Sequence, residues 1–172
     1  MSRIALERAD TEPVAFDEQL SLDGGPLGED VVSVGAVGVS GVVRKDGDGY
    51  TLEGRVRGEG VLRCARCLET FPFRFSEAVS LRLLPLSAAP PDEETQLQRT
   101  DLDTRFYDAP QADLDEIATE QFVLAVPMKP LCTESCLGLC PTCGTNLNRG
   151  SCSCPETADE RWQPLAAWRP TN

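Results

Sequence analysis

Residues 50–83 read YTLEGRVRGEGVLRCARCLETFPFRFSEAVSLRL, and their pattern decides the fold. Apolar side chains fall on every second position on both sides of a C-x-x-C pair, with polar side chains between them. These apolar residues are Tyr50, Leu52, Val56 and Leu62 before the pair, and Phe71, Phe73, Phe75, Val79, Leu81 and Leu83 after it. A period of two is typical of a half-buried β-strand. The stretch therefore predicts two strands joined by a turn at Cys64 and Cys67.

Three residues interrupt this alternation. Gly58 and Gly60 indicate a bulge or bend in the first strand, because glycine weakens regular pairing. Glu77 falls on the apolar face of the second strand, where we expect another bulge. The alternative for Glu77 is a buried carboxylate with a functional role.

The segments before residue 50 predict further strands. Residues 4–22 have the composition of one or two strands, and a glycine-rich turn is expected at 23–26. Residues 31–43 are β-branched with interleaved glycine, which favours strands over a helix. The D-G signal within residues 45–49 predicts a hairpin turn. Strands joined by short turns predict an antiparallel sheet, or a small open barrel.

The pattern changes after residue 85. Residues 85–99 are proline-rich and then acidic, which predicts a loop. Residues 113–126 have apolar side chains at helical spacing, an Asp113–Glu116 capping pair at the start and Pro127 and Pro130 after the end. A short terminal helix is expected at 159–168. The fold class is therefore α+β: residues 1–130 form a sheet domain with one covering helix and an acidic loop at about 86–112, and residues 131–172 form a cysteine-rich, zinc-binding tail packed on the same domain.

The eight cysteines are the candidate metal ligands. They are Cys64, Cys67, Cys132, Cys136, Cys140, Cys143, Cys152 and Cys154. Zinc binds four thiolates in a tetrahedron, and a C-x-x-C turn supplies two of them. We favour one site formed by Cys140, Cys143, Cys152 and Cys154, and another formed by Cys64, Cys67, Cys132 and Cys136. Because no open ligand position is evident, we expect one or two zinc ions with a structural role.

The same cysteines are also compatible with two other kinds of chemistry. A C-x-x-C pair can cycle between dithiol and disulfide when one thiol has a lowered pKa, and Arg66 lies beside such a pair. Clustered cysteines can also form a disulfide network in an exported protein. The first ten residues do not resemble a signal peptide, and the longest apolar run, at 31–43, is too short to span a membrane. We therefore expect a cytoplasmic protein whose cysteines bind metal.

Composition argues against most catalytic chemistry. The chain contains no histidine, so the commonest general base and the Ser-His and Cys-His nucleophile pairs are excluded. The sequence has no phosphate-binding glycine loop. The net charge is −12, and residues 92–120 alone carry ten acidic and two basic side chains. This acidic segment is either a solvated surface or a binding site for a basic protein.

Several motifs in order resemble one protein family. They are LRCARCLETF, DLDEIATEQFVLAVPMKPLC, the cysteine series with CPTCGTNLN, and the terminal DERW-x-x-L. Over residues 30–170 the chain resembles the YceD family, whose members are described as large ribosomal RNA subunit accumulation proteins. The resemblance implies a non-enzymatic bacterial factor that supports accumulation or processing of the large-subunit (23S) ribosomal RNA.

The resemblance also implies the kind of partner. A ribosomal RNA precursor, or a basic ribosomal or assembly protein, is expected, with no small-molecule substrate and no membrane contact. The alternatives in other classes are a thiol-disulfide redox protein and a zinc-ribbon-like protein-interaction module.

Overall fold

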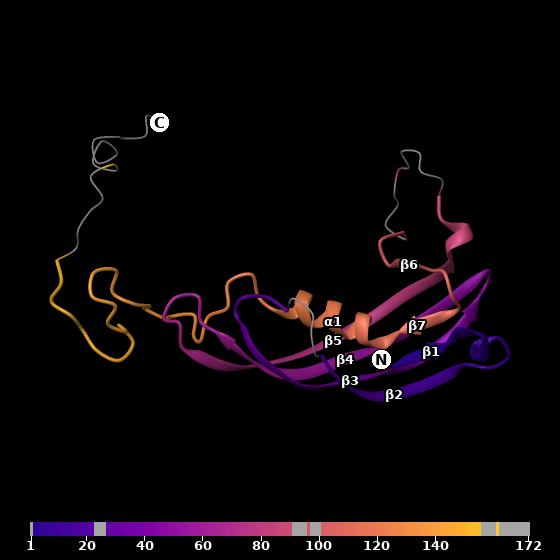
Figure 1. The fold of residues 1–172 in the computed structure, drawn as a ribbon, viewed down its shortest axis with the longest axis horizontal. Coiled ribbons are helices and arrows are strands. Elements are labelled where there is room, and N and C mark those ends of the chain that lie inside the picture. The colour runs from indigo at the N-terminus through magenta and orange to yellow at the C-terminus, as the bar shows by residue number, and fades with distance from the viewer. Residues whose placement is uncertain (1, 23–26, 91–95, 97–100, 156–160, 162–172) are drawn as a thin grey trace.

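The computed structural model describes residues 2–22, 27–90, 96, 101–155 and 161, and in them a twisted sheet carries one α-helix on one face (Figure 1). The elements in chain order are β1 (Arg3–Ala5), η1 (Leu6–Ala9), β2 (Val14–Ser21), β3 (Val31–Asp46), β4 (Gly49–Arg63), β5 (Thr70–Pro85), η2 (Leu86–Ala88), β6 (Thr104–Tyr107), β7 (Gln111–Asp113) and α1 (Leu114–Ala125). This is the α+β class that the sequence predicts.

The main sheet has five strands in the order β2-β3-β4-β5-β6 and is open. Strands β2 to β5 form an antiparallel meander, as predicted, whereas β6 pairs with the end of β5 in parallel. A separate two-stranded ribbon joins β1 to β7. The sheet is therefore mixed rather than purely antiparallel. Strand β6 lies inside the expected acidic loop at about 86–112 and β7 lies at its end, and both are too short for a periodic signal to show in the sequence.

The strand pairing is interrupted in β3, not in β4 or β5 as the sequence predicts. Strand β4 pairs with β5 without a shift from Tyr50 to Arg63, so β4 has no extra residue at Gly58 and Gly60, although its pairing with β3 shifts register at these glycines. The extra residues are in β3, between Val31 and Val37, opposite those glycines. No bulge occurs at Glu77 either, and its side chain is exposed. Glu77 lies on a part of β5 that has no outer neighbour among the described strands, so the carboxylate reaches solvent from the sheet edge.

Two local signals are confirmed. The β3–β4 hairpin turns through Gly47 and Asp48, and Gly47 has a φ of 56°, which glycine adopts without strain. Helix α1 begins after Asp113, whose Oδ1 accepts a hydrogen bond of 3.2 Å from the backbone N–H of Glu116. The expected turn at 23–26 and the terminal helix at 159–168 lie outside the described residues.

Helix α1 packs its apolar side on the sheet. Phe122 is fully buried, and its ring meets those of Phe75 and Phe73 edge-on, with centroids 5.4 and 6.4 Å away. Leu114, Ile117 and Ala118 complete the buried side of the helix. In the part of the chain described here, no helix is both long and apolar enough to span a membrane.

Candidate metal centres

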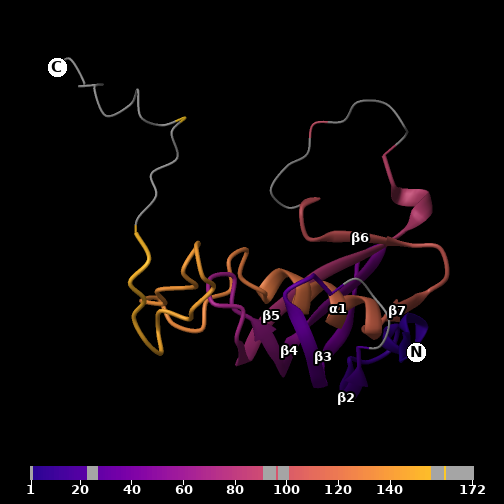
Figure 2. The same cartoon turned by 60° about the vertical axis from the view of Figure 1, so that its left-hand side comes forward.

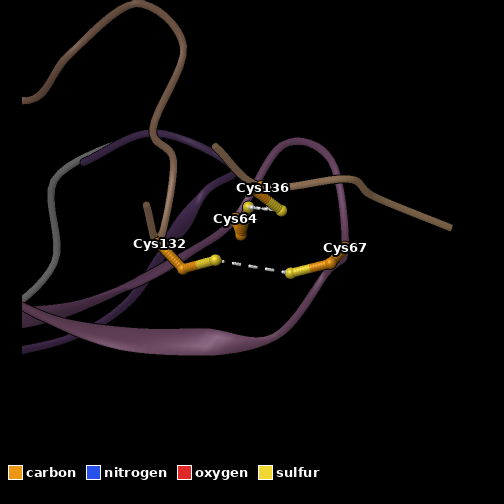
Figure 3. Close-up of side chains that lie close together, drawn as sticks. All are labelled: Cys64, Cys67, Cys132 and Cys136. Carbon is orange, nitrogen blue, oxygen red and sulfur yellow. Dashed lines mark hydrogen bonds between the residues drawn. The ribbon is translucent and has the colours of Figure 1, made fainter. Parts of the chain in front are cut away.

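The β4–β5 turn and the segment after α1 bring four cysteines together. The segment after α1 lies beside the β4–β5 turn (Figures 1 and 2). Cys64 and Cys67 belong to the turn, and Cys132 and Cys136 belong to the segment after the helix. Their Sγ atoms all lie within 4.8 Å of one another and point toward a common centre (Figure 3). Three of the four side chains are buried. We refer to these four residues as cluster 1.

The sulfur positions in cluster 1 fit a tetrahedral zinc ion. The Sγ atoms of Cys64 and Cys136 are 3.8 Å apart, and those of Cys67 and Cys132 are 3.7 Å apart. Four sulfurs at about 2.3 Å from a central zinc would be separated by about 3.8 Å. A disulfide needs a separation of about 2.05 Å, and all eight cysteines are free thiols in the structure.

The remaining four cysteines form a second group. Cys140, Cys143, Cys152 and Cys154 also have Sγ atoms within 4.8 Å of one another. Only Cys140 is buried, so this group is more open to solvent than cluster 1. We refer to it as cluster 2. The two clusters contain the same sets of residues that the sequence spacing favours.

Both C-x-x-C turns have the same backbone geometry. The N–H of Leu68 donates to the carbonyl of Cys64 over 2.9 Å, and the N–H of Gly144 donates to the carbonyl of Cys140 over 2.9 Å. In each turn the N–H of the first cysteine also donates to the carbonyl five residues later. The residue after the second cysteine has a positive φ in both, 60° at Leu68 and 72° at Gly144. From the sequence, a positive φ could be predicted only at Gly144, because leucine seldom adopts this conformation.

Neighbouring polar groups hold the cysteines in place. Arg66 Nη1 donates to the carbonyl of Cys136 over 2.7 Å, which connects the turn to the tail. Asn148 Nδ2 lies 3.3 Å from Cys136 Sγ in cluster 1, and Thr145 Oγ1 lies 3.2 Å from Cys143 Sγ in cluster 2. Donors of this kind stabilise a thiolate and orient a metal ligand. Asn148 could not be predicted from the sequence, because a single asparagine in a loop carries no signal.

The thiols in each cluster have divergent pKa values. Burial raises the pKa of Cys64, but hydrogen bonds from the backbone of Cys67, Cys132 and Arg66 outweigh it and lower the pKa to about 6. Hydrogen bonds from Thr145 lower the pKa of Cys143 to about 6.

In each cluster a second cysteine has a raised pKa. A backbone hydrogen bond from Glu69 lowers the pKa of Cys67, but burial and the neighbouring Cys64 thiol outweigh it and raise the pKa to about 12. The Cys143 thiol and burial raise the pKa of Cys154 to about 12. Four crowded thiols resist losing all their protons, and a divalent cation supplies the compensating charge.

The chain resembles known proteins over most of its length. It matches the YceD family, described as large ribosomal RNA subunit accumulation proteins, over residues 52–168. It is 31% identical over 118 residues to uncharacterized proteins of Mycobacterium bovis and of two strains of Mycobacterium tuberculosis. The alignment covers 69% of this chain and 55% of each relative, so the chain spans about half the length of the curated relatives it matches. No solved structure matches the chain.

Proposed function

Because the chain belongs to the YceD family of large ribosomal RNA subunit accumulation proteins, we propose that it is a cytoplasmic ribosome-biogenesis factor supporting accumulation of the large-subunit (23S) ribosomal RNA. The single observation that carries this proposal is the family match, which extends over the β4–β5 pair, α1 and both cysteine clusters.

The protein acts by binding rather than by catalysis in this proposal. The absence of histidine removes the commonest general base, and the perturbed thiols all belong to the two clusters. The partner is a ribosomal RNA precursor or a basic ribosomal or assembly protein.

The two clusters hold structural zinc in this proposal, with all eight cysteines as ligands. A site whose four positions are all filled by protein stabilises a fold instead of activating water. Cluster 1 connects the tail after α1 to the β4–β5 turn, and the buried side chains of Cys64 and Cys136 are part of a small apolar cluster there. Zinc then fixes the cysteine-rich segment from Cys132 to Cys154 to the sheet.

Depletion of the protein in its host tests the function. The ratio of mature large-subunit to small-subunit ribosomal RNA is expected to fall, while precursor forms of the large-subunit RNA accumulate or are degraded. Re-expression of the wild-type chain from a plasmid is the control and restores the ratio. An unchanged ratio in fully depleted cells contradicts the proposal.

A further inference from the structure

Charge is unevenly distributed over the two faces of the sheet. Helix α1 covers one face of the sheet (Figure 1). The core side chains point to that face, and the exposed side chains that alternate with them point to the opposite face. We call this the outer face, formed by β2, β3, β4 and β5. Six arginines project from it: Arg44, Arg55, Arg57, Arg63, Arg74 and Arg82.

Four acidic side chains share the outer face, two of them on β4 at the alternate positions beside Arg55 and Arg57, and the six arginines outnumber them. Glu53 pairs with Arg44 over 3.3 Å, and Glu59 pairs with Arg74 over 3.4 Å. Asp17 and Asp46 lie at the margins, on the edge strand β2 and at the β3–β4 hairpin. The outer face therefore has a net charge of +2, whereas the other ten basic and 24 acidic side chains of the sequence sum to −14.

Arg55 and Arg57 occupy the middle of the outer face on the central strands. Strand pairing places Arg57 in a row with Gln19, Gly38 and Ser76, none of which is charged, and places Arg55 in a row that ends at Asp17 on the edge strand β2. Arg55 Nη1 donates to Ser76 Oγ over 3.2 Å, which holds one guanidinium near the other. The Cα atoms of residues on alternate positions of one strand lie about 7 Å apart, so the two side chains leave the sheet as neighbours.

A shallow hollow surrounds Arg57. Its volume is about 360 Å³, and its amide and charged side chains are those of Gln19, Arg57, Glu59 and Arg74, with Glu59 paired to Arg74 over 3.4 Å. A Cβ at Gly38 would lie 2.9 Å from Gln19 Nε2 and 3.4 Å from Arg57 Nε, so both side chains lie over the glycine. Besides the Glu59 carboxylate, which the Arg74 guanidinium balances, the hollow has amide and guanidinium donors around space that a phosphate oxygen can enter.

We propose that the outer face binds the phosphate backbone of folded RNA through Arg55, Arg57 and their neighbours. Arginine forms charge-assisted, two-pronged hydrogen bonds with phosphate. Strand β4 has 15 residues and so extends for about 50 Å, enough to follow several phosphates.

The lack of stacking groups points to double-helical RNA. No aromatic side chain points outward from the described strands β2 to β5, so the stacking platform of single-strand binders is missing. A duplex, in contrast, is recognised through its shape and its phosphates. The acidic remainder of the surface does not prevent this contact, because charges more than about 8 Å away are largely screened at physiological ionic strength.

This inference rests on the proposed function only for its biological context, and RNA binding by the pure protein tests it directly. The full-length, zinc-loaded chain is titrated into a fluorescein-labelled RNA hairpin over a series of salt concentrations, with anisotropy as the readout. The test variant is Arg55→Gln/Arg57→Gln. The control variant is Arg8→Gln/Arg149→Gln, which changes the net charge equally but lies in η1 and in the tail.

The expected result separates the two variants. The test variant binds the hairpin on the order of tenfold more weakly at low salt, and its slope of log K against log salt falls by about 2. The control variant binds as the wild type does, and a single-stranded RNA binds more weakly than the hairpin. All four substitutions are at exposed positions, and circular dichroism checks that the folds are equal.

Two results would overturn the inference. One is absence of hairpin binding by the wild type at low salt, and the other is an equal loss in both variants. If the pure protein binds no RNA while its depletion still lowers the large-subunit RNA, the RNA-binding face is wrong and the proposed function stands. Capture of an acidic protein by the outer face instead of RNA also counts against it.

Discussion

Removal of cluster 1 is expected to destabilise the sheet domain much more than removal of cluster 2. The perturbation is a pair of variants that each lose one zinc site, Cys64→Ser/Cys136→Ser and Cys143→Ser/Cys154→Ser. Zinc in cluster 1 would join Cys67 to Cys132, which are 65 residues apart in the chain. The chain-entropy relation for a crosslink of that length gives about 4 kcal/mol.

Cluster 2 closes a much shorter loop. About nine residues separate its two halves, for which the same relation gives about 2.6 kcal/mol, and the constraint stays within the tail. Loss of this site therefore leaves the unfolding of the sheet almost unchanged. Loss of cluster 1 also exposes the apolar contacts that Phe71, Leu131 and Leu139 make around it, so 4 kcal/mol is a lower estimate.

Two measurements check this prediction. Zinc analysis of the purified proteins should give two ions per wild-type chain and one in each variant. Urea unfolding, followed by far-UV circular dichroism, should then show a large loss of stability in the first variant and a loss below about 1 kcal/mol in the second. Equal destabilisation in the two variants, or an unaffected first variant, would refute the reasoning.

Three further outcomes are expected. Phe122→Ala should lower the free energy of unfolding by about 3–5 kcal/mol because it empties the centre of the core, whereas Leu124→Ala, at a 76% exposed position on the same helix, should change it by less than about 0.5 kcal/mol in chemical denaturation. Asp113→Ala should cost about 1 kcal/mol at pH 7 through loss of the helix cap. Burial raises the pKa of Asp113, but the Glu116 N–H and Arg3 outweigh it and lower the pKa overall, so the difference from wild type should be present above about pH 4 and vanish as the pH falls below it. Thiol-reactive dye should label the native protein slowly and label all eight cysteines once a chelator is added; immediate labelling without the chelator would favour the redox alternative.

The sequence allowed most of the local structure to be predicted. Alternation in residues 50–83 predicted β4 and β5, the D-G signal located their neighbouring hairpin, and the capping pair located the start of α1. Each of these signals depends on contacts between residues close in the chain. The strands β6 and β7 were missed because each has four residues or fewer, and their pairing partners are distant in sequence.

The positions of the bulges also depend on strand pairing, which local sequence signals do not encode. The glycines of β4 lie opposite the observed bulge, but the extra residues are in β3. The sequence could not distinguish the two strands, because either partner can accommodate the extra residue of a bulge. Glu77 was expected to force a bulge, yet it lies at a sheet edge where a carboxylate reaches water without one. Edge and centre are properties of strand order, which the alternation of side chains does not encode.

The sequence by itself determined which residues could bind metal and which strand faces are apolar, since cysteine spacing and side-chain period are local properties. Cysteine spacing favoured grouping Cys64 and Cys67 with Cys132 and Cys136, but only the tertiary structure brings their sulfurs within 4.8 Å, because the meander and α1 fold a 65-residue separation back on itself. The arginines of the outer face are likewise scattered along three strands, from β3 to β5. They form one surface because pairing in register aligns alternate positions of neighbouring strands on the same side of the sheet.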